Sequence, residues 1–113
     1  MTVERMSFNQ ITLDPWSLEK TVAECVRLEV PYVAAWRHKL GDCAAAGRLM
    51  RDAGLKVSSL CRGGWFSAPT AAERLAKMDD NRKAIDEAAE IGAPGLVIVT
   101  GPVDPTPGPG PNP

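Results

Sequence analysis

Arginine, glycine and aromatic residues follow one another in "SSLCRGGWF", residues 58–66. The planar guanidinium of Arg62 suits a phosphate, a carboxylate or a polarised hydroxyl. Gly63 is one of two adjacent glycines that let the backbone approach a ligand closely, and Phe66 offers an apolar surface for a ligand. These residue types predict one wall of a ligand pocket, with Arg62, Gly63 and Phe66 as its contacts. The alternative is an exposed loop arginine paired with a surface acid.

Three more candidates lie near the ends of the first two expected strands. Gln10 carries an amide that can hydrogen-bond a substrate hydroxyl, Trp36 an aromatic surface, and His38 a ring that can carry a proton. Each has a plainer alternative: a tryptophan at a strand end often packs, and a histidine without an identifiable partner is often a surface residue. No catalytic residue is assigned. Cys61 beside Arg62 lacks the base and orienting group that a nucleophile needs, so buried packing is favoured.

Short apolar strands alternate with amphipathic helices along the chain. Strands are expected at 7–13, 31–36, 55–61 and 95–100, and helices at 15–28, 43–54 and 70–92. Asp14 followed by Pro15 predicts the start of the first helix. Thr70 and Glu73 form a capping box that opens the third. The βαβαβαβ order predicts a parallel sheet with right-handed crossovers.

Two apolar patterns predict how these elements are buried. The third helix carries an apolar stripe at helical spacing, formed by Leu75, Met78, Ile85 and Ala89. The last strand contains "LVIV" at 96–99, which is continuously apolar. Such a run predicts a strand that is buried on both faces.

Composition and charge exclude several classes of protein. The chain has 113 residues with 13 basic and 14 acidic side chains, a net charge of -1. The sequence contains no stripe of basic residues, so its charge pattern does not predict nucleic acid as a partner. The apolar runs are too short to cross a membrane and the start has no secretory signal, so we expect a cytoplasmic protein with no membrane partner. Cys25, Cys43 and Cys61 are widely spaced, which predicts free thiols rather than a zinc site or a disulfide framework.

The C-terminal segment differs in composition from the rest. Prolines at 102, 105, 107, 109, 111 and 113 cannot continue a helix or pair inside a sheet. They predict a disordered or polyproline-like tail over 102–113, following a single unit over 6–101. Alternatively, the natural protein continued here into a fourth helix.

Two segments of the sequence resemble a known family most specifically: "SSLCRGG" at 58–64 and "DDNRKAIDEAAEIGA" at 79–93. Together with "NQITL" and "VAAWR" they resemble the N-terminal part of sugar phosphate isomerases/epimerases, in the xylose isomerase-like TIM-barrel superfamily. The resemblance covers about residues 6–101. It implies an α/β fold with strands 1–4 and helices 1–3, the N-terminal half of a (β/α)8 TIM barrel, because a complete barrel needs about 250 residues.

The resemblance also implies a chemistry. Complete members isomerise or epimerise a sugar or sugar phosphate by proton transfer next to a carbonyl, and a divalent metal stabilises the developing enediolate. The metal ligands of the superfamily come mainly from the second half of the barrel, and nothing here matches them. We therefore expect no cofactor and no catalytic metal in this chain alone, and no activity without the rest of a barrel.

Two other functions stay open. The chain is alternatively a small α/β domain that binds a ligand or a protein without catalysis. It is otherwise a half-barrel that assembles as a homo-oligomer, or with a separately encoded second half, to bury the open edges of its first and fourth strands.

Overall fold

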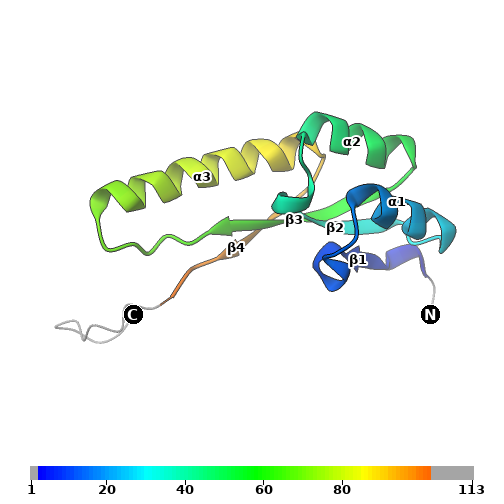
Figure 1. Cartoon of the computed structure of the whole chain (residues 1–113), viewed down its shortest axis with the longest axis horizontal. Coiled ribbons are helices and arrows are strands. Elements are labelled where there is room, and N and C mark those ends of the chain that lie inside the picture. Colours follow the sequence, from blue (N-terminus) through cyan, green and yellow to red (C-terminus); the bar gives the residue numbers. More distant parts are fainter. Residues whose placement is uncertain (1–2, 103–113) are drawn as a thin grey trace.

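Four parallel strands form one sheet in the order of the sequence (Figure 1). The computed structural model describes residues 3–102. Its strands are β1 (Ser7–Asn9), β2 (Tyr32–Trp36), β3 (Lys56–Gly64) and β4 (Leu96–Val99), and its helices are α1 (Leu18–Arg27), α2 (Cys43–Asp52) and α3 (Ala71–Glu90). Short 3₁₀ helices are η1 (Val3–Arg5), η2 (Gln10–Leu13) and η3 (Arg37–Lys39). The predicted α/β class and the parallel βαβαβαβ order are confirmed. The expected tail, apart from residue 102, lies outside the described residues.

Two boundaries near the N-terminus differ from the sequence prediction. The first strand ends at Asn9, because the side chain of Asn9 accepts a hydrogen bond from the backbone N–H of Ile11 and starts η2. Helix α1 begins after Ser17, whose hydroxyl accepts from the N–H of Lys20 at 3.1 Å. The predicted first strand therefore starts at the right residue, Ser7, but ends four residues too late, and the predicted helix start at Pro15 is wrong. Serine is as good a cap as aspartate, so local preference did not separate the two sites.

Strand β3 is longer than predicted and contains a bulge. It continues through Gly64, whereas the prediction ended it at Cys61. Cys61 pairs with Val97 of β4 and Gly63 pairs with Ile98, so Arg62 has no partner residue in β4. A bulge of this kind bends a strand and redirects its side chains. Arg62 thus lies inside a strand and not in a loop after it.

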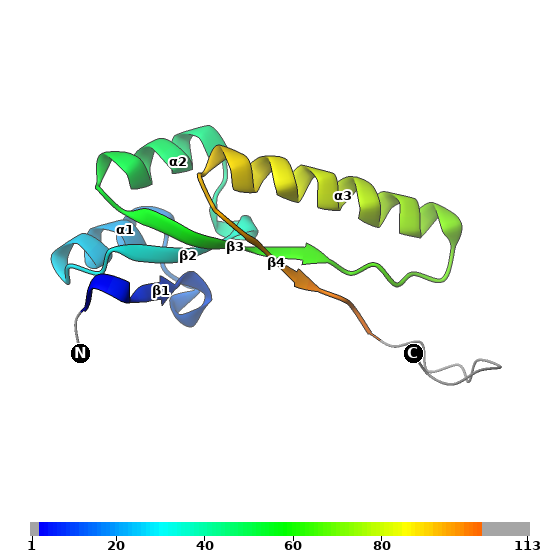
Figure 2. The ribbon, with the colours of Figure 1, turned by 180° about the vertical axis from the view of Figure 1, so that it is seen from behind.

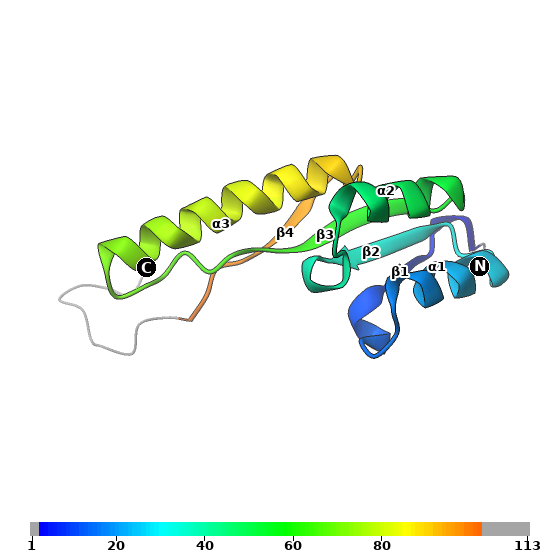
Figure 3. The ribbon, with the colours of Figure 1, turned by 45° about the horizontal axis from the view of Figure 1, so that its top comes forward.

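The core lies between the sheet and the helices. Val33, Ala35 and Leu60 from β2 and β3 are completely buried, and Met50 of α2 is 1% exposed. Consecutive parallel strands joined by right-handed crossovers place all their helices on one face of the sheet. Figure 3 shows α1 beside β1 and β2, α2 beside β3, and α3 extending past them along β3 and β4. The other strand face carries polar contacts, such as the 2.7 Å hydrogen bond between the hydroxyls of Ser7 and Ser58.

Helix α3 does not use its predicted stripe to contact the sheet. Leu75, Met78 and Ile85 are 61%, 44% and 59% exposed, and Ala89 is also exposed. The buried residues of α3 are instead Asn81, Ala84 and Ala88. Small side chains allow the helix to approach β3 closely, and the amino-terminal half of α3 extends beyond the end of β3 (Figure 2).

Strand β4 is also more exposed than predicted. Val97 and Ile98 are 42% and 46% exposed. Within residues 3–102, β4 has a neighbour strand on one side only, because β4 is the last strand of the sheet. The prediction of burial on both faces is wrong for the described chain, and an apolar edge is left in contact with water.

The described chain has no helix that is both long and apolar enough to cross a membrane. Cys25, Cys43 and Cys61 are all free thiols, as predicted. Burial raises the pKa of each thiol, and at Cys61 it outweighs the opposite effect of the Arg62 charge. A raised pKa disfavours the reactive thiolate, which agrees with a packing role for Cys61.

Candidate functional site

The candidate residues lie at or just beyond the carboxyl ends of the strands. Because β1, β2 and β3 are parallel, these ends meet at one edge of the sheet. In α/β proteins this edge is where ligands bind. The predicted candidates come from three successive positions along it: Gln10 after β1, Trp36 and His38 at the end of β2, and Arg62, Gly63 and Phe66 at the end of β3.

Arg62 is exposed at the bulge of β3. Its guanidinium carbon lies 4.5 Å from the centre of the Trp65 ring, a cation–π contact that orients the side chain. Within residues 3–102 no carboxylate forms an ion pair with Arg62. Stacking on an aromatic ring leaves the N–H groups at the edge of the guanidinium plane able to donate to an anion.

The two glycines after Arg62 have a structural role that the sequence prediction missed, because a side chain at either position would overlap neighbouring atoms. A Cβ on Gly63 would lie 2.7 Å from Oδ1 of Asn81, and a Cβ on Gly64 would overlap the carbonyl of Val99. Gly64 also has a φ of +105°, which side chains rarely adopt. Gly63 and Gly64 are buried, so they allow α3 and β4 to approach the backbone of β3. These protein contacts explain both glycines without a ligand, and the ligand contact predicted for Gly63 stays a prediction.

Asn81 is a central residue of this region that sequence reasoning did not single out. Its Oδ1 accepts from the N–H of Gly64 at 2.5 Å, and its Nδ2 donates to the Gly64 carbonyl at 2.8 Å. Nδ2 also donates to the carbonyl of Lys77. The signal was present, because asparagine is unfavourable inside a helix and needs a reason to be there. This amide fixes the end of β3 against α3.

Arg37 and Trp36 are adjacent, but they point to opposite sides of the sheet. Arg37 reaches α3, where it pairs with both carboxylate oxygens of Asp80 at 2.9 and 3.0 Å and with Glu87 at 2.5 Å. The guanidinium of Arg37 holds the pKa of Asp80 below its usual value. Arg37 also donates to the carbonyl of Arg62 at 3.3 Å. Its charge is neutralised within the fold, whereas that of Arg62 is exposed at the strand ends.

Trp36 is held by two residues from the end of β1. Its indole Nε1 donates to Oδ1 of Asn9, and its backbone N–H donates to Oε1 of Gln10, both at 2.8 Å. Gln10 is completely buried, and its Nε2 has no hydrogen-bond partner among residues 3–102. Gln10 therefore positions the backbone of Trp36. Direct contact with a substrate hydroxyl would require that its amide nitrogen become accessible.

His38 has a partner, contrary to the expectation from sequence. Its Nε2 lies 2.7 Å from Oδ1 of Asp14, and this hydrogen bond lowers the pKa of Asp14. The edge of the His38 ring packs on Trp36, with the ring centres 5.9 Å apart. The carboxylate fixes the orientation of the ring and leaves Nδ1 for another partner. A carboxylate–histidine pair of this kind can accept and return a proton.

Phe66 lies beyond β3 beside the end of β4. Its backbone N–H donates to the carbonyl of Thr100 at 3.2 Å, and its side chain is 43% exposed. Phe66 is thus an exposed aromatic residue four positions after Arg62 along the chain. The structure thus brings Arg62 and Phe66 to the end of β3, and Trp36 and His38 to the end of β2.

The described residues contain few side chains that could act together as metal ligands. Over residues 3–102 there is no group of three or more histidine, cysteine or carboxylate side chains arranged to hold a metal ion. His38 and Asp14 bind each other, and two such groups are fewer than a divalent cation needs. The described residues do not fit a catalytic metal.

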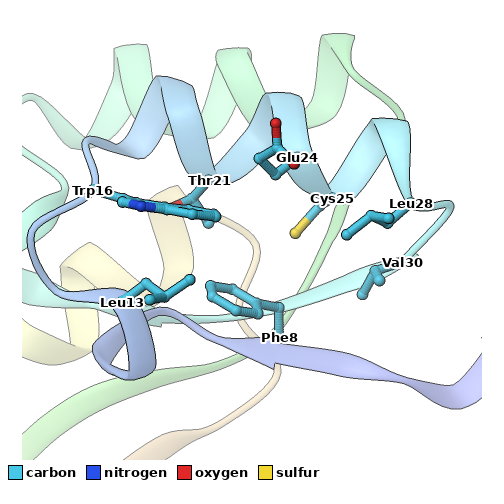
Figure 4. A pocket seen from close by; sticks show the side chains of 8 residues that line it. All are labelled: Phe8, Leu13, Trp16, Thr21, Glu24, Cys25, Leu28 and Val30. Atoms are coloured by element: carbon cyan, nitrogen blue, oxygen red, sulfur yellow. The ribbon is translucent and has the colours of Figure 1, made fainter.

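A separate apolar pocket lies between α1 and β1 (Figure 4). Its volume is about 140 Å³, and only apolar atoms line its surface. Phe8 of β1, Leu13, Trp16, Cys25 and Val30 form most of it. It lies on the helix side of the sheet and holds none of the candidate site residues.

The chain was compared with family models, curated proteins and solved structures. No family model and no curated protein matches the chain. The crystal structure of protein SMc04130 from Sinorhizobium meliloti 1021 is similar, with 41% sequence identity and a TM-score of 0.81. The match covers 86% of this chain and 36% of that one. The chain therefore spans little more than a third of the length of this solved protein.

Proposed function

We propose that this chain is the N-terminal half of a sugar phosphate isomerase/epimerase-like barrel, and that its strand-end edge contacts a sugar phosphate. Three observations support the proposal. The segments "SSLCRGG" and "DDNRKAIDEAAEIGA" resemble sugar phosphate isomerases/epimerases, and the four parallel strands follow the order of the sequence. The chain also matches only a part of a longer solved protein. In such barrels the loops at the carboxyl ends of the strands form the site.

The exposed charge of Arg62 is the observation that carries this proposal. Arg37 is neutralised by Asp80 and Glu87, while Arg62 is exposed at a bulge near the carboxyl end of β3 and stacks on Trp65. A planar guanidinium can donate two parallel hydrogen bonds to a phosphate. In this proposal Arg62 binds the phosphate of the substrate and Phe66 packs on an apolar face of the sugar.

The other residues have supporting roles. Asp14 orients the ring of His38, which then presents Nδ1 to a substrate hydroxyl at the end of β2. Gln10 and Asn9 fix Trp36 beside it. Complete members of the family use a divalent metal to stabilise negative charge on the substrate. The described residues do not supply its ligands, so we propose binding by this chain and no turnover.

The test is a binding experiment with three probes: inorganic phosphate, a hexose and the corresponding hexose phosphate. Titration calorimetry should show that the hexose phosphate binds more tightly than the hexose. Arg62→Ala should weaken its binding about tenfold or more, because a charge-assisted hydrogen bond is lost. Arg48→Ala is the matched control, since Arg48 is an exposed arginine on α2. Equal affinities in the two variants, or no binding of the hexose phosphate by the wild type, would refute the proposal.

A further inference from the structure

Trp65, whose ring contacts the Arg62 guanidinium, has an unusual backbone conformation. Its φ is +56°, in the left-handed region that a bulky side chain rarely adopts. Such a conformation costs free energy and persists only where the surrounding structure fixes it. Glycine or asparagine adopts it at lower cost. A tryptophan at this position therefore indicates that its ring has a role.

The chain at the end of β4 fixes the backbone of Trp65. The N–H of Trp65 donates to the carbonyl of Val99 at 2.5 Å. The next two residues donate to the carbonyls of Thr100 and Pro102, through a backbone N–H at 3.2 Å and a serine hydroxyl at 2.9 Å. A change of φ at Trp65 would move the segment away from these three acceptors. The left-handed conformation is therefore imposed by the pairing with residues 99–102.

Gly101 leaves room for the side chain of Trp65. A Cβ on Gly101 would lie 3.4 Å from Cα and 3.6 Å from Cε3 of Trp65, and 2.8 Å from Oγ of Ser67. The backbone of Gly101 is thus in close contact with Trp65, which is half-buried. The indole therefore links the backbone at Gly101 to the guanidinium of Arg62.

The contact with Trp65 restrains the side chain of Arg62. The guanidinium carbon lies 4.5 Å from the centre of the ring, and a weakly hydrated guanidinium packs well on an aromatic surface. Ordering a long, flexible side chain during binding weakens affinity by about three- to tenfold. An arginine that is already ordered avoids this loss.

We propose that Trp65 is a positioning residue of the anion site: its ring, fixed by the end of β4, keeps the Arg62 guanidinium oriented before a phosphate binds. The ligand in this inference rests on the proposed function, whereas the contact between the two side chains exists without a ligand. In the alternative, the ring only fills space beside Gly101. Leucine and phenylalanine at position 65 separate the two roles, because both fill space and only phenylalanine offers a ring.

The first test uses NMR of the full chain without a ligand. Protons above an aromatic ring resonate upfield, so the δ-methylene protons of Arg62 should lie upfield of those of Arg48, an exposed arginine on α2. The shift should persist in Trp65→Phe and vanish in Trp65→Leu. Trp16→Leu is the matched control, since Trp16 contacts Lys20 at 4.7 Å in the same way and should not affect Arg62.

The wild-type spectrum is decisive by itself. If the protons of Arg62 resonate where those of Arg48 do, the ring does not order the guanidinium and the inference is wrong. This comparison needs no variant, so it also holds if Trp65→Leu proves unstable by circular dichroism.

The second test is titration calorimetry with a hexose phosphate and with inorganic phosphate. Trp65→Leu should weaken the binding of the hexose phosphate about three- to tenfold, and Trp65→Phe less than about twofold. A double variant with Arg62→Ala and Trp65→Leu should bind no more weakly than Arg62→Ala alone, because Trp65 acts through Arg62.

Each remaining outcome has one meaning. Equal affinities of the Trp65→Leu and Trp65→Phe variants would show that the ring only packs. Additive losses in the double variant would show that Trp65 acts independently of Arg62. If the wild type binds neither probe, the proposed function fails, and the NMR spectra still decide whether Trp65 orders Arg62.

Discussion

Asn81 in the middle of α3 hydrogen-bonds both backbone polar groups of Gly64 at the end of β3, with its Oδ1 accepting from the N–H and its Nδ2 donating to the carbonyl. The side chain is buried, so water cannot replace either bond. The side-chain amide of Asn81 thus pairs with the backbone of Gly64 as a neighbouring strand would, and it fixes the segment that follows Arg62. It links the candidate site to the helix whose sequence carries much of the family resemblance.

Replacing Asn81 with alanine should lower the free energy of unfolding by about 1–3 kcal/mol, because the N–H and the carbonyl of Gly64 would be buried without partners. Urea denaturation measures this change. Lys83→Ala, an exposed position two residues further along α3, serves as the control and should change stability by less than about 0.5 kcal/mol. Similar effects of both substitutions would show that Asn81 does not hold Gly64 in solution.

Two glycines that share a positive φ should respond differently to alanine. Gly41 has a φ of +61°, and a Cβ added there would meet no atom within 4 Å, so Gly41→Ala should cost only the conformational strain, about 1–2 kcal/mol. Gly64→Ala adds overlap with the carbonyl of Val99 and should cost more than about 3 kcal/mol. Thermal unfolding of both variants gives the comparison. A smaller loss for Gly64→Ala than for Gly41→Ala would contradict the close approach of β4 to β3.

The contact between Arg37 and Asp80 should appear in the pH dependence of stability. Arg37 lowers the pKa of Asp80 in the folded state below its ordinary value of 3.8. The stabilisation is therefore present above that value and is lost as the pH falls through the lower, folded-state pKa. Asp80 is 57% exposed, so the effect should stay below about 1 kcal/mol.

Unfolding free energies measured between pH 6 and pH 2 test this expectation. Asp80→Asn should lose less stability than the wild type over this range, since the titrating group is gone. Asp52→Asn, at the exposed end of α2, is the control and should follow the wild type. An unchanged slope for Asp80→Asn would exclude the proposed ion pair.

The pair of His38 and Asp14 can be tested without a ligand. The hydrogen bond from His38 lowers the pKa of Asp14, so His38→Ala should raise that pKa toward its ordinary value of 3.8. Carboxyl ¹³C NMR titration of Asp14 reports the change directly. Lys39→Ala is a useful comparison, because the charge of Lys39 contributes least to the lowering. A larger shift in Lys39→Ala than in His38→Ala would contradict the assignment of His38 as the main partner.

The order and type of the helices and strands could be predicted from the sequence. Each element has a clear hydrophobic period, and turn residues separate it from the next. The sequence was insufficient where two local signals competed. Asp14-Pro15 and Ser17 are both good helix starts, and the folded chain uses Ser17. The bulge at Arg62 was also missed, since it depends on the register between β3 and β4, two strands separated by a long helix.

The burial of α3 shows a different limit. Apolar periodicity identified the stripe that contains Leu75, Met78 and Ile85, but periodicity does not say which partner the stripe contacts. The sheet is contacted by the small face with Ala84 and Ala88. The partners of His38 and Arg37 were likewise hidden, because Asp14 and Asp80 are brought to them only by the fold. The barrel half and its sugar chemistry stay predictions.

The most direct measurement for the central claim, that the strand ends bind a sugar phosphate, is a backbone amide NMR titration of the full chain with a hexose phosphate. We expect shift changes to concentrate at Trp36, His38, Arg62 and Phe66, along the carboxyl ends of β2 and β3, and to be largely lost in Arg62→Ala. Shift changes that concentrate at the apolar pocket between α1 and β1, or that persist unchanged in Arg62→Ala, would contradict the claim.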